Sequence, residues 1–261
     1  MSYEGYLSSD QVGTTYIKPI DQGWKKVTYA VVGDLAVFEG CIILGTVEEM
    51  KAVANFVEQN PGILHPETQA FGVAIKGVQY RWKDRTVPYE IANNLPNKQR
   101  VTGAIAHWHQ KTPFKFVPRD AGNPNHKDYV VFRPGNGCSS TVGRKGGVQY
   151  VSLGDGCTMG NCIHEIGHTV GLWHEQSRAD REKFIEVVWG NIIPSTSHNF
   201  DQHVVDGIDL GNYDYGSIMH YPVDAFSKNG QNTLRPKQHT DAHIGQRDGL
   251  STGDIAAIQH L

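Results

Sequence analysis

The segment from Cys162 to Arg178, C-I-H-E-I-G-H-T-V-G-L-W-H-E-Q-S-R, constrains the fold of this chain more than any other feature. On an α-helix, His164 and His168 lie one turn apart on the same face, so two imidazole nitrogens can reach one metal ion about 2.0 to 2.1 Å away. A straight helix cannot supply a third ligand from another direction. Gly171 permits a positive φ, which would end the helix and bring His174 back to the ion. The segment therefore predicts a helix that stops at Gly171 beside a three-histidine site.

Glu165 follows the first of these histidines directly and is the candidate general base. Three protein ligands with one open position are typical of catalytic zinc rather than of closed structural zinc. The alternative is that the histidines are surface or core residues that meet by chance. Five residues are fixed over eleven positions, as H-E-x-x-H-x-x-G-x-x-H, which favours the metal site over that alternative.

Composition excludes several other classes of protein. The chain has 261 residues, and its 24 Lys and Arg against 27 Asp and Glu give a formal charge of -3, which argues against a nucleic-acid partner and against disorder. Its apolar residues are interrupted by 29 glycines and 12 prolines, and no window approaches the roughly 18 to 20 apolar residues of a membrane span. We expect a monomeric globular protein with no nucleic-acid or membrane partner, built as a catalytic domain plus an appendage.

The first 70-odd residues read as a small α/β unit. Two apolar runs, residues 25–33 and 35–44, have strand length, and Thr46 with Glu49 has the spacing of a capping box that opens a helix. A stretch rich in proline and glycine at residues 59–72 is the candidate boundary.

Beyond that boundary the pattern predicts an α+β domain whose second half, residues 190–250, is irregular. Ser251 and Asp254 have capping-box spacing before a short closing helix. The expected strands are residues 78–82, 87–92, 114–118, 128–132 and 148–153, and the expected helices are 96–110, 161–170 and 254–261.

These motifs resemble the astacin family of metzincin metalloproteases. The zinc segment continues as Glu175-Gln176-Ser177-Arg178, and the family's Met-turn is matched by Ser217-Ile218-Met219-His220-Tyr221. The resemblance covers nearly all of residues 73–261. It implies a metzincin-like α+β fold with a twisted, mostly parallel sheet, an antiparallel edge strand, an active-site helix and an irregular C-terminal subdomain.

The resemblance also implies roles for the site residues. One catalytic Zn²⁺ would be held by His164, His168 and His174, with Met219 as an apolar floor beneath them. Tyr221 would be a fifth ligand of the mature enzyme at rest and would leave the metal to stabilise the oxyanion of the transition state. Without the resemblance, Met219 would read as a core methionine and Tyr221 as a half-buried turn tyrosine.

The predicted reaction is hydrolysis of peptide bonds in protein or peptide substrates. Zinc lowers the pKa of its water towards about 7, and Glu165 takes the proton and passes it to the leaving amine. Two alternatives remain open. One is an inactive zinc-dependent module that captures peptides, and the other is a zinc amidase that acts on cell-wall peptides.

The cysteines at 41, 138, 157 and 162 allow several pairings from composition alone. The resemblance implies a Cys138–Cys157 disulfide, whereas the family's other bridge lacks both partners here. A disulfide indicates an oxidising compartment, so we expect a secreted protein, although its amino terminus shows no export signal. Cys162 points away from the metal face of its helix and reads as a buried, inert thiol.

Cys41 stands in a segment, Phe38-Glu39-Gly40-Cys41-Ile42, that resembles the family's F-x-G-D-I propeptide motif with cysteine in place of aspartate. The hypothesis is that its thiolate completes a closed three-histidine, one-cysteine zinc site and keeps the precursor latent. The alternatives are a core cysteine in an apolar strand and a disulfide to Cys162. Residues 1–72 would then be an inhibitory propeptide, and residues 73–261 the catalytic domain.

Aligning Tyr80 and Trp82 with the family's amino-terminal Y-x-W places the mature start near Val73. An activating protease, either the enzyme itself or another, would cut near residue 72. The freed amino group would bind Glu175, whose alternative reading is a solvated turn residue.

An extended substrate would add to a sheet edge, here predicted at Val148, Gln149, Tyr150, Val151 and Ser152, whose alternative is an ordinary edge. Ser139 replaces the aromatic residue usual after Cys138 in the family.

Overall fold

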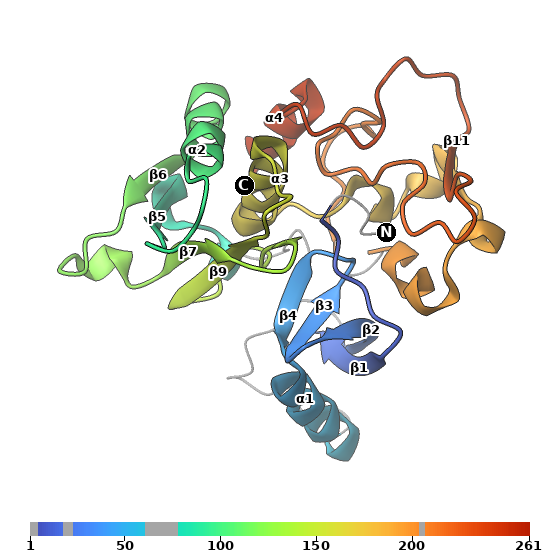
Figure 1. The fold of residues 1–261 in the computed structure, drawn as a ribbon, viewed down its shortest axis with the longest axis horizontal. Coiled ribbons are helices and arrows are strands. Elements are labelled where there is room, and N and C mark those ends of the chain that lie inside the picture. The colour runs from blue at the N-terminus through green and yellow to red at the C-terminus, as the bar shows by residue number, and fades with distance from the viewer. Residues whose placement is uncertain (1–4, 18–22, 61–77, 204–206) are drawn as a thin grey trace.

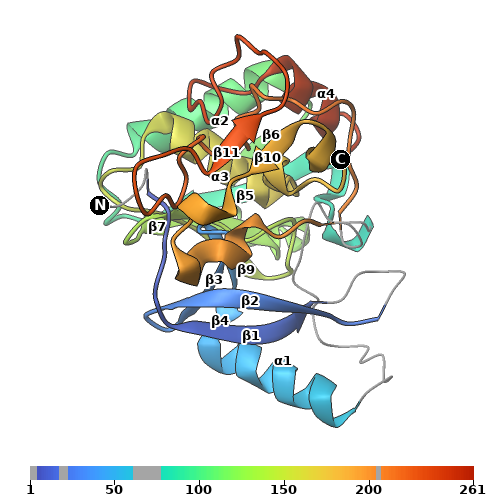
Figure 2. The ribbon, with the colours of Figure 1, turned by 90° about the vertical axis from the view of Figure 1, so that its right-hand side faces the viewer.

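The computed structural model describes residues 5–17, 23–60, 78–203 and 207–261, and the statements below concern those ranges. The predicted boundary at 59–72 and the mature start near Val73 lie almost wholly outside them. Figures 1 and 2 show a small N-terminal sheet on one side of the molecule, with its helix on the face turned away from a larger sheet and its helices. Within the described ranges, no helix has the length and apolar character needed to cross a bilayer.

The N-terminal unit is an antiparallel sheet whose strands follow chain order, packed against one helix. Its core includes Tyr29, Phe38, Leu44 and Met50, all nearly inaccessible to solvent. Thr46 and Glu49 form the predicted capping box. The elements are β1 (Val12–Ile17), β2 (Lys25–Val32), β3 (Leu35–Phe38), β4 (Ile42–Thr46) and α1 (Val47–Gln59).

The predicted strand at 35–44 is in fact two strands, β3 and β4, joined by a tight turn. Glu39 and Gly40 have φ values of 46° and 72°, which are left-handed and end the ladder. Glycine is required at position 40 because a Cβ there would lie 2.7 Å from the Phe226 ring. The turn places Cys41 at the end of the sheet that faces the larger unit.

The larger sheet has the order β6-β5-β7-β9-β8, in which β8 alone is antiparallel. This confirms the predicted, mostly parallel sheet with an antiparallel edge strand. Helices α2 (Gln99–Lys111) and α3 (Met159–Val170) pack on each other and share the main core with the sheet. The strands are β5 (Thr86–Ile91), β6 (Lys115–Pro118), β7 (Tyr129–Pro134), β8 (Cys138–Ser139) and β9 (Val148–Leu153).

Two expectations about strands are wrong. The run at 148–153 forms β9 but lies between β7 and β8, so it is not the sheet edge. The edge strand on this side of the sheet is β8, which at two residues is too short to show a hydrophobic period. Residues 78–82 are not a strand. Their first three residues form the 3₁₀ turn η1 (Val78–Tyr80), and a second turn, η2 (Lys83–Arg85), follows them. The Arg144 guanidinium, rather than a neighbouring strand, satisfies the carbonyls of Gln79 and Arg81.

The C-terminal half is irregular, as predicted. One antiparallel pair, β10 (Ile185–Val187) with β11 (Leu234–Pro236), is its regular sheet structure among the described residues. Helix α4 (Thr252–Ile258) opens on the predicted Ser251–Asp254 capping box. The remaining 3₁₀ turns of the molecule are η3 (Pro124–His126), η4 (Glu175–Ser177), η5 (Arg181–Lys183), η6 (Trp189–Asn191) and η7 (Pro194–Phe200).

Candidate active site

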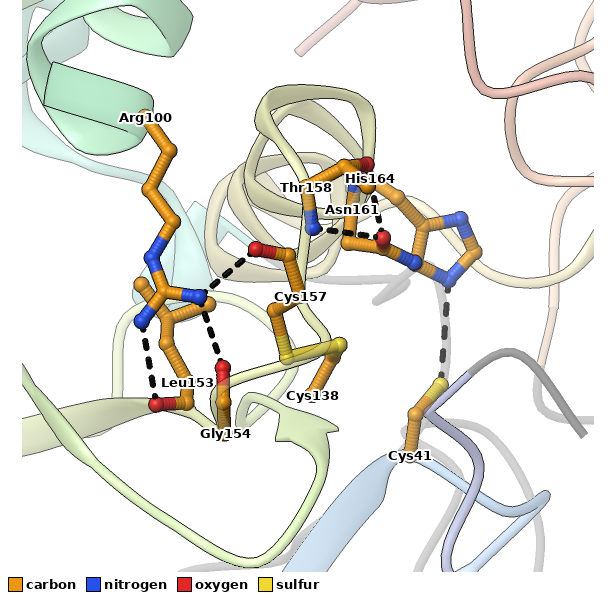
Figure 3. The surroundings of a disulfide bond; sticks show 9 residues. All are labelled: Cys41, Arg100, Cys138, Leu153, Gly154, Cys157, Thr158, Asn161 and His164. Carbon is orange, nitrogen blue, oxygen red and sulfur yellow. Dashed lines mark hydrogen bonds between the residues drawn. A yellow bond between two sulfur atoms is a disulfide. The ribbon is translucent and has the colours of Figure 1, made fainter. Parts of the chain in front are cut away.

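Helix α3 carries the first half of the site and is fixed at both ends. It starts with a capping box between Thr158 and Asn161 and ends at Gly171, whose φ of 114° is the predicted left-handed stop. The loop before it is closed by the predicted Cys138–Cys157 disulfide. Figure 3 shows the Arg100 guanidinium beside this loop, donating to the carbonyls of Leu153, Gly154 and Cys157.

Four buried ligand atoms converge at the end of α3. The Nε2 atoms of His164 and His168 are 3.1 Å apart, and the Cys41 Sγ lies 3.7, 3.3 and 3.2 Å from the Nε2 atoms of His164, His168 and His174. Tetrahedral zinc with ordinary bond lengths separates two nitrogens by about 3.3 Å and a nitrogen from a sulfur by about 3.6 Å. The observed spacings match a closed three-histidine, one-cysteine site, so the predicted convergence of all four residues is confirmed.

Each histidine has its other ring nitrogen fixed by an acceptor. The Nδ1 atoms of His164 and His168 donate to the carbonyls of Ile218 and Leu172, both at 2.8 Å, and that of His174 donates to the Glu39 carboxylate at 2.7 Å. The proton therefore sits on Nδ1, and the Nε2 lone pairs face the centre. Burial lowers the pKa of all three imidazoles and so favours the neutral, metal-binding form.

The Cys41 thiol also fits a site for a cation. Burial raises its pKa, and the nearby carboxylates of Glu165 and Glu39 raise it further. A divalent ion between the four donors would reverse this balance and favour the thiolate. The residues present therefore suit Zn²⁺ as the resident ion.

Glu165 lies on α3 beside this centre and is 1% exposed. Its Oε2 atom has no hydrogen-bond partner among the described residues, and burial raises the pKa of its carboxyl group. A buried carboxylate oxygen without a protein partner can accept a hydrogen bond from a reacting water or substrate.

The Met-turn, residues 217–221, packs against helix α3. A Cβ at Gly167 would lie 2.6 Å from the Met219 sulfur, so the methionine reaches the helix only because position 167 has no side chain. Tyr221 is fully buried, and its ring centroid lies 4.6 Å from that of His174. Its hydroxyl donates to the backbone carbonyl of Glu39 at 2.7 Å. The phenol is thus beside the site but is held by the N-terminal unit.

The N-terminal unit contacts the site with two segments. Near Cys41, Ser140 donates to the Cys41 carbonyl at 3.0 Å and Ile43 donates to the Ser140 carbonyl at 2.9 Å, so this stretch runs parallel to the chain that continues β8. The second segment is Gly5 to Leu7, where Cys138 of β8 donates to the Gly5 carbonyl at 3.0 Å.

Tyr6, in this second segment, packs with its ring centroid 5.1 Å from that of Tyr221, and its hydroxyl accepts a hydrogen bond from Arg247 at 2.7 Å. The sequence does not predict this segment, because residues 1–11 carry no periodic pattern. The contribution of Glu39 is also absent from the sequence-based predictions, although the Phe38–Ile42 motif that contains it gives a signal for it.

Glu175 follows the third histidine, His174, directly in the chain. Its Oε1 accepts a hydrogen bond from the Asp214 amide at 2.8 Å and lies 3.6 Å from the Arg178 guanidinium. Burial outweighs these partners and raises the pKa of Glu175 to about 8. The carboxyl group lines a small cavity of about 60 Å³, together with Trp173 and Ala257.

The predicted substrate edge, residues 148–152, is an interior strand of the sheet. Within β9, Gln149 and Val151 are buried, and the Gln149 amide donates to Thr141 and Gly143. The alternation of Val148, Tyr150 and Ser152 with these residues reflects an interior strand with one exposed face.

A helix that carries two of three histidine ligands, a glycine turn that returns the third, and a methionine turn beneath them define a metzincin-type metal site. The comparisons with known proteins are more specific. Residues 74–261 match the peptidase family described as Astacin. The chain belongs to the astacin family.

Relatives in this family include zinc metalloproteinase nas-13 of Caenorhabditis elegans, 42% identical over 199 residues that cover 73% of this chain and 43% of that protein. Zinc metalloproteinase nas-4 of the same organism is 40% identical and is matched over 72% of this chain and 61% of its own length. The chain thus spans less than two thirds of these relatives.

Among solved structures, High choriolytic enzyme 1, a hatching enzyme zinc-protease from Oryzias latipes (medaka fish), aligns with a TM-score of 0.61 and 33% identity, over 77% of this chain and 97% of that one. A structure of myroilysin is a more distant likeness, with a TM-score of 0.46 and 19% identity over 70% of this chain and 95% of that one.

Proposed function

We propose that this chain is a latent zinc endopeptidase, in which residues 73–261 hydrolyse peptide bonds in proteins and residues 1–72 are the inhibitory propeptide. The observation that carries the proposal is the convergence of three histidines and Cys41 on one point, with the Glu165 carboxylate beside it. A tetrahedral ion held by these three histidines and Cys41 would have no position open to substrate, and an open position is what hydrolysis requires.

His164, His168 and His174 would hold the ion, which when bound supplies a Lewis acid and lowers the pKa of water. Glu165 then accepts the proton of the attacking water and delivers it to the leaving amine. Tyr221, once its hydroxyl leaves the Glu39 carbonyl, would donate to the substrate carbonyl oxygen as negative charge develops there. The freed edge at Cys138–Ser140 supplies backbone partners for an extended substrate.

Activation would follow cleavage near residue 72, by the enzyme itself or by another protease. The new amino group near Val73 would occupy the cavity beside Glu175, where a cation would offset the burial that raises the pKa of this carboxyl group. The Cys138–Cys157 disulfide supports a secreted enzyme that folds in an oxidising compartment.

The test of the activity uses the matured chain with casein, with and without o-phenanthroline. Glu165→Gln should bind zinc as the wild type does, by metal analysis, yet lose casein hydrolysis by about a hundredfold or more, because it has no general base. Retained hydrolysis would overturn the assignment of Glu165. Cleavage of peptidoglycan peptides but not of casein would identify an amidase, and bound zinc without either activity would identify an inactive module.

The test of the latent form is X-ray absorption at the zinc edge of the full chain. Sulfur in the first coordination shell is expected from Cys41, and a shell of nitrogen and oxygen alone would remove the cysteine block. Cys41→Ala should then give a leaky or self-cleaving precursor, and an equally latent Cys41→Ala chain would contradict the proposal.

A further inference from the structure

The Glu39 side chain is a buried anion that the N-terminal unit inserts into the larger unit. The larger unit, residues 78–203 and 207–261, is called the catalytic unit below. The residue is 0% exposed, and its Oε2 accepts the Nδ1 proton of His174 at 2.7 Å. Its Oε1 accepts hydrogen bonds from the Ser177 hydroxyl at 2.7 Å and from His203 Nε2 at 2.6 Å. All three donors come from the catalytic unit, so this one carboxylate joins the two units with three charge-assisted bonds.

The backbone of the same residue makes a fourth contact. The left-handed conformation of Glu39, with φ of 46°, accompanies the bond from the Tyr221 hydroxyl to the Glu39 carbonyl at 2.7 Å. One residue therefore holds both the third histidine ligand and the tyrosine next to it, two positions before Cys41.

Packing alone does not explain an acid at this position. The neighbouring Phe38 already supplies the apolar contact, with ring centroids 5.9 Å from Trp173 and 5.8 Å from His203. A buried carboxylate costs free energy unless its partners offset the lost hydration. Here the donors on His174, Ser177 and His203 provide that offset, because each lies 2.6 to 2.7 Å from a carboxylate oxygen of Glu39.

We propose that Glu39 is a second lock on the latent site, separate from the Cys41 thiol. Its carboxylate orients His174 and ties the Cys41 turn to Ser177 and His203, while its carbonyl keeps the Tyr221 phenol away from the reacting atoms. Cys41 therefore leaves the centre only when this set of bonds breaks. The role is one of positioning and regulation, and it rests on the latent-peptidase function proposed above.

The two free thiols of the chain provide the measurement. Cys41 and Cys162 are both buried, and they lie in different units. Labelling of the zinc-loaded full chain with a thiol reagent, followed by peptide mass mapping, reports the release of Cys41 and the opening of the catalytic core at Cys162 separately.

Glu39→Gln should label at Cys41 about tenfold faster than the wild type, because losing one charge-assisted hydrogen bond is worth roughly this factor or more. Labelling at Cys162 should not change. The matched control is Glu58→Gln, which removes an exposed carboxylate from the same N-terminal unit and should label at the wild-type rate at both thiols.

Two outcomes would overturn the second lock. Either Cys41 in Glu39→Gln labels at the wild-type rate, or Cys41 and Cys162 accelerate together, which would show general destabilisation. If Glu39→Gln does not fold, Ser177→Ala decides, with an expected acceleration of about fivefold at Cys41 alone. Zinc content and casein hydrolysis are measured on the same preparations, so a chain without peptidase activity would not be mistaken for one without the lock.

Discussion

The two units of the molecule reach the metal site by opposite means. The N-terminal unit is a regular antiparallel sheet that reaches the site with the stretch from Glu39 to Ile43, and the segment from Gly5 to Leu7 that precedes the sheet reaches it as well. The C-terminal half is irregular, and buried arginines hold its backbone, as where Arg181 donates to the carbonyls of Gln176 and Phe200. In the N-terminal sheet, backbone groups of neighbouring strands bond one another. In the C-terminal half, side-chain donors satisfy backbone carbonyls, so its stability depends on individual residues.

The hydrophobic cores of the two units are also largely separate. The N-terminal core is a cluster of its own, which Val142 and Trp173 join from the larger unit. Among the described residues, the main core of the larger unit contains no buried residue before Trp82. The main core of the larger unit thus does not depend on the N-terminal sheet, whereas Val142 and Trp173 are buried against that sheet and link the two units beside the contacts at the metal site.

Removing zinc should have the largest effect, because the ion joins ligands from both units. At a free zinc concentration about a thousand times the dissociation constant, the metal adds roughly 4 kcal/mol to the free energy of unfolding. Chelation should lower the stability by that amount and raise hydrogen exchange in β3 and β4. In Cys41→Ala, exchange in β3 and β4 should no longer respond to chelation. An equal response in the two proteins would show that zinc does not link the units.

Arg181→Met should weaken the irregular C-terminal half and leave the N-terminal sheet unchanged. It leaves two buried carbonyls without a donor, and we expect the free energy of unfolding to fall by about 3 kcal/mol in denaturant titrations. Arg235→Met, at an exposed arginine paired with Glu186, is the control and should change stability by less than about 0.5 kcal/mol. Equal losses in both variants would mean that the buried arginine is not a structural donor.

Tyr6→Phe should give the smallest effect. It removes the Arg247 hydrogen bond to the Tyr6 hydroxyl, worth about 1 kcal/mol, and should speed hydrogen exchange at the Leu7 amide about fivefold. Tyr16→Phe removes an exposed hydroxyl bond to Glu58 in the same unit and should not affect Leu7. Unchanged hydrogen exchange at Leu7 in Tyr6→Phe would show that the Tyr6 hydroxyl does not stabilise the segment from Gly5 to Leu7 at the site.

Local signals in the sequence predicted most of the catalytic helix. The histidine spacing and the stop at Gly171 depend on residues within a few positions of one another, and both appear as expected. The same is true of the two predicted capping boxes, which begin other helices at Thr46 and Ser251. The disulfide and the position of Cys41 followed from the family resemblance.

Features that depend on distant contacts could not be predicted in this way. The role of Glu39 arises from three residues 135 to 164 positions away. The alternation of Val78, Tyr80 and Trp82 suggested a strand, but the Trp82 indole is buried by donating to the Thr169 carbonyl. The edge strand was misplaced because β8 has two residues and owes its position to the adjacent disulfide and to β9.

The sequence distance between Cys41 and His164, 123 residues, has a consequence for how inhibition would end. While both lie on one covalent chain, the inhibitory turn is present at an effective concentration in the millimolar range or above. A cut near residue 72, as we propose, changes none of the contacts at the metal site. It makes rebinding of the released turn a bimolecular event, so at low protein concentration dilution alone would favour the open enzyme.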